Sequence, residues 1–326
     1  MSKAVTLNRY GPPDVLQVED VKACTTKNGE VLVKHSAIGV NRIDLQMRSG
    51  QKTFGELKQP LVLGYEASGV IQELGDNVDG FKVGDKVAYA TAQVGAYVDF
   101  RCIHHKYLIT VPDSITEDIA AASIFKGLTA HYLAARAFII KEGTAVLIHG
   151  VAGGVGRLLS QIANSKGAVV IGTVISEQEK QIALEFGCHK VFNTQSEDWV
   201  ASVLDLTKGI GVTAVYDGLG AEVFDKSLEC LMRMGVLISY GDITGQVSNI
   251  DMDKVRNKSI FVTAPSIFHY KSNRMELLLS AHDIFSMIES SKLKVEIEQA
   301  FSLSDVAKAH QLLESGNTRG SIILKP

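Results

Sequence analysis

The chain has 326 residues, 46% of them hydrophobic, and its 33 Lys and Arg against 36 Asp and Glu residues give a net charge of −3 at pH 7. This length predicts two domains, and the balanced charge argues against binding to nucleic acid or an anionic membrane surface. The sequence starts without an apolar signal segment, and its apolar stretches are too short to span a bilayer. We therefore expect a cytoplasmic protein that does not bind a membrane.

The first part of the chain, to about residue 110, predicts short strands separated by clusters of Gly, Asp, Asn and Pro. The expected strands span residues 4–7, 30–34, 67–71, 86–90 and 97–100. Residues 75–85, which are rich in Gly and Asp, are typical of a turn between two strands. This pattern favours a β-rich, barrel-like domain.

Beyond about residue 120, strands alternate with helices, which is the pattern of a doubly wound parallel sheet. The expected strands span residues 145–148, 168–174, 191–192, 214–217, 235–239 and 259–262. The last of them is apolar and unprotected by charge, so we expect a twofold partner to cover it in a homodimer.

The last stretch predicts a helix over residues 274–290 and a final strand at 321–324, which return to the first domain. We therefore expect an α/β protein of two domains. Residues 1–120 plus 268–326 form the β-rich domain, and residues 121–267 form the doubly wound domain.

A glycine turn joins the strand at residues 145–148 to a helix that begins near Val155. A backbone without Cβ atoms can approach a pyrophosphate closely, and the first N–H groups and positive dipole end of the helix face the anion. The strand at 168–174 follows after one helix length, as a right-handed βαβ crossover requires. The stretch predicts a dinucleotide site; the alternative is a turn with a purely structural role.

The four cysteines, Cys24, Cys102, Cys188 and Cys230, are far apart in the sequence. They form no CxxC pair, no compact metal-binding spacing and no dense disulfide framework. We expect reduced, unpaired thiols.

Several segments in one order along the chain resemble a known family. They are residues 11–16, 39–44, 63–69 and 127–130, the glycine turn, residues 215–217 and the closing pair 320–321. Together they resemble the zinc-free branch of the medium-chain dehydrogenase/reductases, and within it the NADPH:quinone reductases of the zeta-crystallin-like group. The resemblance implies a GroES-like barrel domain, a Rossmann domain and NADPH as the cofactor.

Zinc-dependent relatives place a Cys where Asn41 stands and a His where Tyr65 stands, and they carry a four-Cys lobe that is missing from this sequence. Zinc at such points needs thiolate or imidazole ligands. The paired His104 and His105 are more typical of a solvated pair than of a ligand set. We expect no metal site.

Cofactor choice depends on the tip of the strand at 168–174, where an acidic residue would bond the ribose 2′-OH of NAD and repel the 2′-phosphate of NADP. The tip carries no acid, so Ser176 and Lys180 are candidates to receive the phosphate. The alternative is that Lys180 is an ordinary solvated residue, and the neighbouring Glu177 and Glu179 weaken the prediction. Bacterial relatives have a Lys at position 179 and an aromatic at position 194, and both are absent.

The resemblance also implies contacts with the cofactor along the rest of the chain, several of them just after predicted strands, where ligands bind in such sheets. The predicted cofactor residues are Asn41, Lys126, Thr129, Gly153, Gly154, Val155, Gly156, Thr173, Ser176, Lys180, Thr194, Gly218, Tyr240, Gly241, Asp242 and Ser266. Relatives usually have Gln in place of Lys126, for which an ordinary surface position is the alternative.

Asn41 and Asp44 resemble the family's pair beside the nicotinamide, and they are the predicted catalytic residues. The side-chain N–H of Asn41 would donate to a substrate carbonyl; alternatively, both residues brace a loop. Arg42 and Gln46, where relatives have aromatics, and His131 are the candidates for contact with the substrate.

The favoured function is hydride transfer from NADPH to a quinone or related conjugated carbonyl. A second possibility is reduction of the C=C bond of enones or 2-alkenals, which needs a positioned acid such as Tyr132 or His131. A third is a nucleotide- and RNA-binding protein with little turnover, as some zeta-crystallin-like relatives are; the lack of basic and aromatic stripes argues against it.

Overall fold

The structure is a computed structural model that describes residues 2–52, 60–316 and 318–326. Contacts group the chain into two compact units. Unit 1 comprises Met1–Lys126, Lys271–Glu289 and Val295–Pro326, and unit 2 comprises Gly127–Tyr270 and Ser290–Lys294. The domain bounds expected from the sequence lie near residues 120 and 268, and they stay a prediction.

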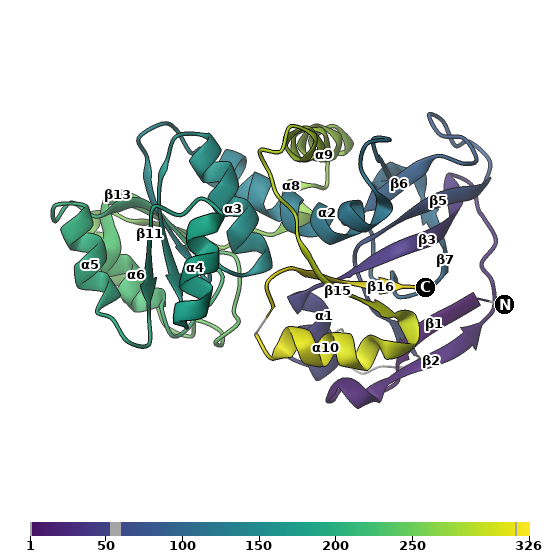
Figure 1. Cartoon of the computed structure of the whole chain (residues 1–326), viewed down its shortest axis with the longest axis horizontal. Coiled ribbons are helices and arrows are strands. Elements are labelled where there is room, and N and C mark those ends of the chain that lie inside the picture. Colours follow the sequence, from purple (N-terminus) through teal and green to yellow (C-terminus); the bar gives the residue numbers. More distant parts are fainter. Residues whose placement is uncertain (1, 53–59, 317) are drawn as a thin grey trace. The chain divides into compact units, whose positions relative to one another are not determined.

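Unit 1 is rich in strands, as predicted, and its sheets are mainly antiparallel (Figure 1). A three-stranded sheet has the order β2-β1-β4, and a seven-stranded sheet has the order β15-β16-β3-β5-β6-β8 with β7 paired to β3. Its strands are β1 (Ser2–Leu7), β2 (Leu16–Val21), β3 (Glu30–Val40), β4 (Leu61–Val62), β5 (Ala67–Leu74), β6 (Lys86–Tyr89), β7 (Phe100–His104), β8 (Ile109–Thr110), β15 (Ile297–Ser302) and β16 (Ser321–Lys325).

The helices of this unit are α1 (Arg42–Ser49), most of α2 (Glu117–Tyr132), α9 (Arg274–Glu289) and α10 (Val306–Glu314). Side chains alternate across a strand, so Val31 and Val33 of β3, both fully buried, lie on one side of the sheet. Ala37 packs with two alanines of α2 and with Ile323 of β16.

Unit 2 is a six-stranded parallel sheet with the order β11-β10-β9-β12-β13-β14. The strands are β9 (Ala145–His149), β10 (Val169–Val174), β11 (Lys190–Asn193), β12 (Val212–Asp217), β13 (Leu231–Ser239) and β14 (Phe261–Thr263). The helices are α3 (Gly154–Ser165), α4 (Glu177–Glu185), α5 (Trp199–Leu206), α6 (Phe224–Cys230), α7 (Met252–Lys258) and α8 (Ile267–Tyr270).

Helices cover both faces of this sheet: α3 and α4 lie on one face, and α5 and α6 lie on the other (Figure 1). Because both faces are covered, the central strands are almost wholly apolar. Leu147, Val215 and Leu237 from three adjacent strands are fully buried in one core. The prediction of a doubly wound parallel sheet is confirmed.

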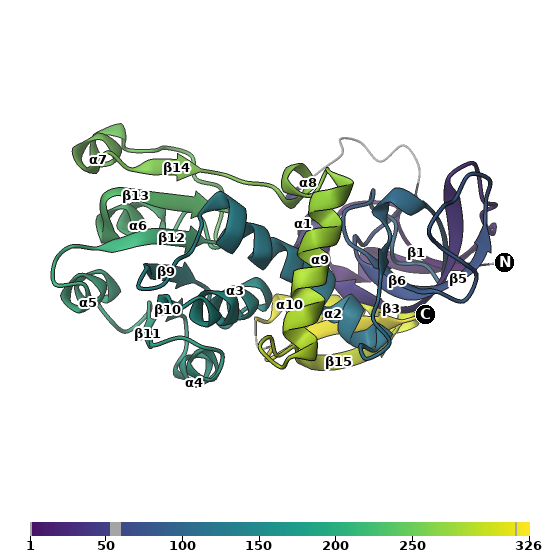
Figure 2. The same cartoon turned by 90° about the horizontal axis from the view of Figure 1, so that it is seen from above.

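Strand β14 lies at the open edge of the sheet, outside β13 (Figure 2). The side chain of Phe261 on this strand is 63% exposed. Within the part of the chain that the structure describes, no helix combines the length and apolar character needed to cross a membrane.

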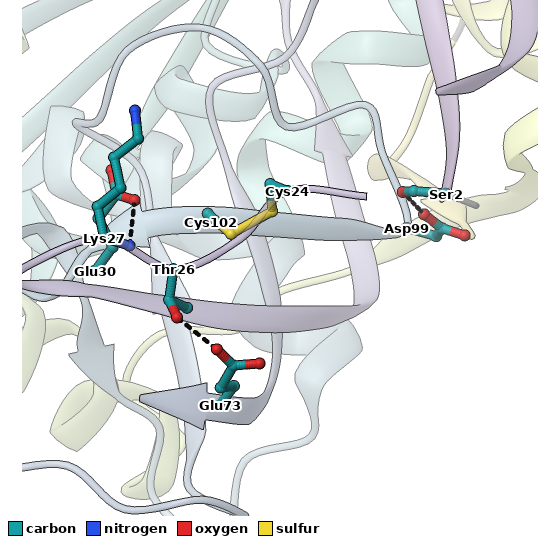
Figure 3. The surroundings of a disulfide bond; sticks show 8 residues. All are labelled: Ser2, Cys24, Thr26, Lys27, Glu30, Glu73, Asp99 and Cys102. Atoms are coloured by element: carbon teal, nitrogen blue, oxygen red, sulfur yellow. Dashed lines mark hydrogen bonds between the residues drawn. A yellow bond between two sulfur atoms is a disulfide. The ribbon is translucent and has the colours of Figure 1, made fainter. Parts of the chain in front are cut away.

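The prediction that all four cysteines are unpaired is wrong for two of them. Cys24 and Cys102 form a disulfide with Cα atoms 5.9 Å apart, whereas Cys188 and Cys230 are free and buried (Figure 3). Cys102 lies on β7, where it pairs with Leu32 of β3, and Cys24 lies in the segment that enters β3. This antiparallel pairing brings the two cysteines together, and a sequence separation of 78 residues does not reveal it.

Candidate functional site

The glycine turn joins β9 to α3 in unit 2. Gly153 is the N-cap of α3 with φ −75°, and the helix begins at Gly154. A Cβ on Gly156 would lie 2.5 Å from the carbonyl oxygen of Gly150, so no larger residue fits without a shift of the backbone. The first N–H groups of a helix have no acceptor within it, and with the helix dipole they form a site for a phosphate group. The predicted residues Gly153, Gly154, Val155 and Gly156 therefore lie together at the amino end of one helix.

A buried histidine at the end of β9, just before this turn, was not predicted from the sequence. His149 places Nδ1 2.8 Å from Oγ1 of Thr173 and Nε2 2.8 Å from Oγ of Ser227. Burial lowers the pKa of His149 to about 3, so the ring is neutral. Thr173, a predicted cofactor residue, is fully buried, and its hydroxyl group contacts His149. Through His149, strands β9 and β10 and helix α6 are joined by side-chain contacts.

The predicted phosphate residues lie at the carboxyl ends of β10 and β11. Ser176 is the N-cap of α4, and its Oγ accepts the N–H of Glu179 at 3.3 Å. Thr194 donates its N–H and its hydroxyl to the carbonyl of Val174, at 2.9 and 3.3 Å. The ammonium group of Lys180 is 2.6 Å from Glu197, so it is part of a salt bridge.

Other predicted cofactor residues follow β12, β13 and β14 on the same edge of the sheet. A Cβ on Gly218 would lie 2.8 Å from Cζ of Tyr240, and one on Gly241 would lie 2.5 Å from the carbonyl oxygen of Gly218, so the two loops pack closely. Asp242 accepts the N–H of Gly245 at 3.1 Å through its backbone carbonyl. Ser266 precedes α8, and its carbonyl accepts N–H groups from that helix.

Asp217, at the end of β12, was not predicted. Its Oδ1 accepts the N–H groups of Leu219 and Gly220 at 2.8 and 2.9 Å. Burial raises the pKa of Asp217 to about 6, although the two N–H groups oppose the shift. This carboxylate shapes the loop that contains Gly218.

Two predicted residues lie in the part of α2 that belongs to unit 2. Thr129 is buried and His131 is half-buried. Next to them, the ring of Tyr132 stacks on Tyr270 with 4.8 Å between the centroids. Burial raises the pKa of Tyr132, so its hydroxyl group stays protonated.

In unit 1 a buried carboxylate joins two of the predicted residues. Oε1 of Glu66 accepts Nδ2 of Asn41 at 2.7 Å and the ammonium group of Lys126 at 3.3 Å. Its Oε2 accepts the N–H of Phe125, in α2, at 2.7 Å. The exposed fractions are 4% for Asn41, 0% for Glu66 and 8% for Lys126, so Lys126 is not an ordinary surface residue.

Asp44 forms a second buried network beside Asn41. Its Oδ2 accepts the backbone N–H of Asn41 at 2.8 Å and the hydroxyl group of Tyr97 at 3.1 Å. The hydroxyl oxygen of Tyr97 is also 3.0 Å from Nε2 of His310. Burial raises the pKa of Asp44 to about 7 against the opposing bonds from Asn41 and Tyr97, and burial with the nearby charge of Arg48 lowers that of His310 to about 3.

The candidate substrate residues of unit 1 lie on the same short helix as Asp44. Arg42 is exposed at the start of α1, and Gln46 is half-buried one turn later. Glu66, Tyr97 and His310 hold the predicted pair in place, and the sequence did not predict them. The one available signal was that Glu66 directly follows Tyr65 in the segment that carries the resemblance.

Among residues 2–52, 60–316 and 318–326, no group of three His, Cys, Asp or Glu side chains is arranged to hold a metal ion. Position 41 carries an amide whose nitrogen faces Glu66.

Comparison with known proteins places these features in a family. Residues 27–137 match the alcohol dehydrogenase GroES-like domain, and residues 154–281 match a family described as zinc-binding dehydrogenase. Quinone oxidoreductase 1 of Escherichia coli K12 is 36% identical over 329 residues, with 100% of both chains covered. A 2-haloacrylate reductase of Burkholderia sp is 35% identical and covers 100% of this chain and 99% of its own.

A solved structure agrees with these similarities. The crystal structure of Escherichia coli quinone oxidoreductase complexed with NADPH superposes with a TM-score of 0.96 at 37% identity, covering 99% of this chain and 100% of that one. Together with the GroES-like match and the doubly wound sheet, this confirms the predicted fold. The chain belongs to the quinone oxidoreductase group of the medium-chain dehydrogenase/reductases.

Proposed function

We propose that the chain is an oxidoreductase that transfers a hydride from NADPH to a quinone. The observation that carries the proposal is the glycine turn at the amino end of α3, where Gly156 packs against the backbone of Gly150 and no side chain caps the helix, in a chain that matches a quinone oxidoreductase from end to end. The bound structure of the Escherichia coli relative supports NADPH as the cofactor. A cytoplasmic location stays a prediction from the sequence.

The residues of unit 2 would bind and orient the cofactor, with Gly153 to Gly156 facing its pyrophosphate. Bound NADPH supplies the hydride. In unit 1, Glu66 accepts one N–H of the Asn41 amide and thereby fixes which side of the amide carries the nitrogen. The second N–H of that nitrogen remains to donate to a substrate carbonyl as negative charge develops on its oxygen. The hydroquinone has a pKa of about 10, so water can protonate it.

We also propose that the reaction needs no zinc. An amide stands at position 41 and a phenol at position 65. Zinc sites use thiolate, imidazole or carboxylate ligands, and the amide nitrogen at position 41 is already bonded to Glu66. Activity that survives dialysis against a chelator supports this proposal, and loss of activity restored by zinc contradicts it.

A direct test combines NADPH oxidation by 1,4-benzoquinone with the variant Asn41→Ala. Removal of one oxyanion donor is expected to lower kcat by about 100-fold. The matched control is Asn257→Ala, because Asn257 is exposed on α7. Equal activity of the two variants would exclude a carbonyl-polarising role for Asn41.

Similarity to a 2-haloacrylate reductase favours a second candidate, reduction of a conjugated C=C bond. This reaction adds a proton at carbon and so needs a positioned acid. A panel of benzoquinones, 2-haloacrylates and simple enones separates the two candidates, and a preference for the enones or haloacrylates would reject quinone reduction as the main activity.

We further propose a homodimer that pairs through the edge strand β14. This strand has an open side, and its Phe261 is 63% exposed. Pairing across a twofold axis would cover both features. Sedimentation analysis is expected to show a dimer for the wild type and a monomer for Phe261→Asp; a monomeric wild type contradicts the proposal.

A further inference from the structure

In a Rossmann domain, the residues at the tip of the second strand contact the adenosine ribose of the cofactor. In unit 2 these residues are the tip of β10 and the first turn of α4. An acidic side chain there bonds the 2′-OH of NADH, whereas a basic one accommodates the 2′-phosphate of NADPH. Strand β10 ends at Val174 and α4 begins at Glu177, so the charges around this turn decide which nucleotide fits better.

Glu179 places a carboxylate at the strand tip although it lies within the helix. Its Oε2 accepts the N–H of Ile175 at 3.0 Å, and its own N–H donates to Oγ of Ser176 at 3.3 Å. This reciprocal pair resembles a capping box and fixes the side chain against the end of β10. A carboxylate has lone pairs for several donors, so this bond leaves Glu179 able to accept a ribose hydroxyl.

Lys180 is the only Lys or Arg between Val174 and His189, and two carboxylates hold it. Its ammonium group is 2.6 Å from Oε1 of Glu197 and 3.7 Å from Oε2 of Glu177. Oε1 of Glu197 also accepts the backbone N–H of Asn193 at 3.1 Å, which fixes its position. Hydrogen bonding and charge in this pair raise the pKa of Lys180 and lower that of Glu197, so both stay ionised.

We propose that Glu179, with Lys180 neutralised by Glu177 and Glu197, makes this subsite accept NADH about as well as NADPH. The 2′-OH of NADH can donate to Glu179. The 2′-phosphate carries roughly −1.5 to −2 charge near pH 7. At this turn it would face Glu179 and a lysine that Glu177 and Glu197 already hold, while the amino end of α4 attracts it. This inference rests on the proposed function only in requiring that the chain binds a nicotinamide nucleotide.

The test is the ratio of the dissociation constants of NADH and NADPH, measured by calorimetry on the wild type and on Glu179→Gln. The wild-type constants are expected to lie within about tenfold of each other, and the variant is expected to shift the ratio toward NADPH by about tenfold, since it removes one charge beside the phosphate. Gln suits the capping position as well as Glu does, and thermal melting checks that the variant is folded.

The matched control is Glu185→Gln, which removes the same charge from an exposed residue at the far end of α4 and is expected to leave the ratio unchanged. Glu197→Gln releases Lys180 and is expected to shift the ratio toward NADPH in the same direction as Glu179→Gln. A wild type that prefers NADPH by more than about 100-fold, or a ratio that Glu179→Gln leaves unchanged, overturns the inference while the proposed function stands. Binding of neither nucleotide overturns both.

Discussion

The side-chain nitrogen of Asn41 lies 2.7 Å from Oε1 of Glu66, and the ammonium group of Lys126 lies 3.3 Å from the same oxygen. One buried carboxylate therefore orients the proposed carbonyl-polarising amide and balances a buried cation. Because Glu66 is fully buried, its carboxylate depends on these protein partners in place of water.

Replacing Lys126 tests the buried ion pair. Lys126→Met leaves the Glu66 carboxylate without its cation, and we expect the free energy of unfolding to fall by about 3–5 kcal/mol. Lys126→Gln keeps a donor for Glu66 and should cost only about 1–2 kcal/mol. Urea unfolding at pH 7 measures both, and equal losses would show that a hydrogen-bond donor to Glu66 at position 126 does not contribute to stability.

Asp44 should make stability depend on pH. Its folded-state pKa of about 7 lies above the ordinary value of 3.8 for an Asp side chain, so between these values the folded protein keeps a proton that the unfolded chain has lost. The contribution of Asp44 is fully present below pH 3.8 and is lost as the pH rises through 7. Asp44→Asn should gain stability relative to the wild type by roughly 1.4 kcal/mol per pH unit across this window. A difference that stays constant with pH would exclude this protonated carboxyl.

His149 should act in the opposite direction. Burial holds its folded-state pKa at about 3, below the ordinary value of 6.5 for a His side chain. Its contribution is present above pH 6.5 and is lost as the pH falls toward 3, because only the unfolded chain takes up the proton. The variant His149→Gln is expected to be less stable than the wild type at pH 7. Below pH 6.5, its free energy of unfolding should rise relative to that of the wild type by roughly 1.4 kcal/mol for each pH unit. Exposed His282 on α9 provides the matched control, His282→Gln.

The disulfide between Cys24 and Cys102 closes a loop of 78 residues in unit 1. Its reduction should lower the free energy of unfolding by about 2–4 kcal/mol, because the unfolded chain gains freedom. Urea unfolding with and without dithiothreitol measures the effect, and the double variant Cys24→Ser with Cys102→Ser should not respond to the reductant. Four free thiols in the denatured, unreduced protein would contradict the pairing.

Features that depend on neighbouring residues could be predicted from the sequence. The strand, glycine turn and helix around Gly156 follow from local periodicity, and so does α9, which spans Arg274–Glu289 as expected apart from one residue. A close backbone approach at a glycine and a repeating apolar face leave a signal within a few positions.

Features that depend on distant pairing could not be predicted. Glu66 meets Asn41 and Lys126 across 25 and 60 positions, and Lys180 meets Glu197 across 17 positions, from one helix to the loop after the next strand. Such contacts arise from strand order and register, so the sequence predicted a phosphate partner at Lys180 without revealing Glu197, which binds its ammonium group. The residues that orient the site are therefore harder to predict than those that form it.

The most direct test of the proposed function is anaerobic turnover with NADPH and 1,4-benzoquinone, following both the nucleotide and the hydroquinone. The account predicts that one hydroquinone forms for each NADPH oxidised and that no oxidation occurs without the quinone. A protein that binds NADPH tightly but oxidises none of it when benzoquinone is added would contradict the account.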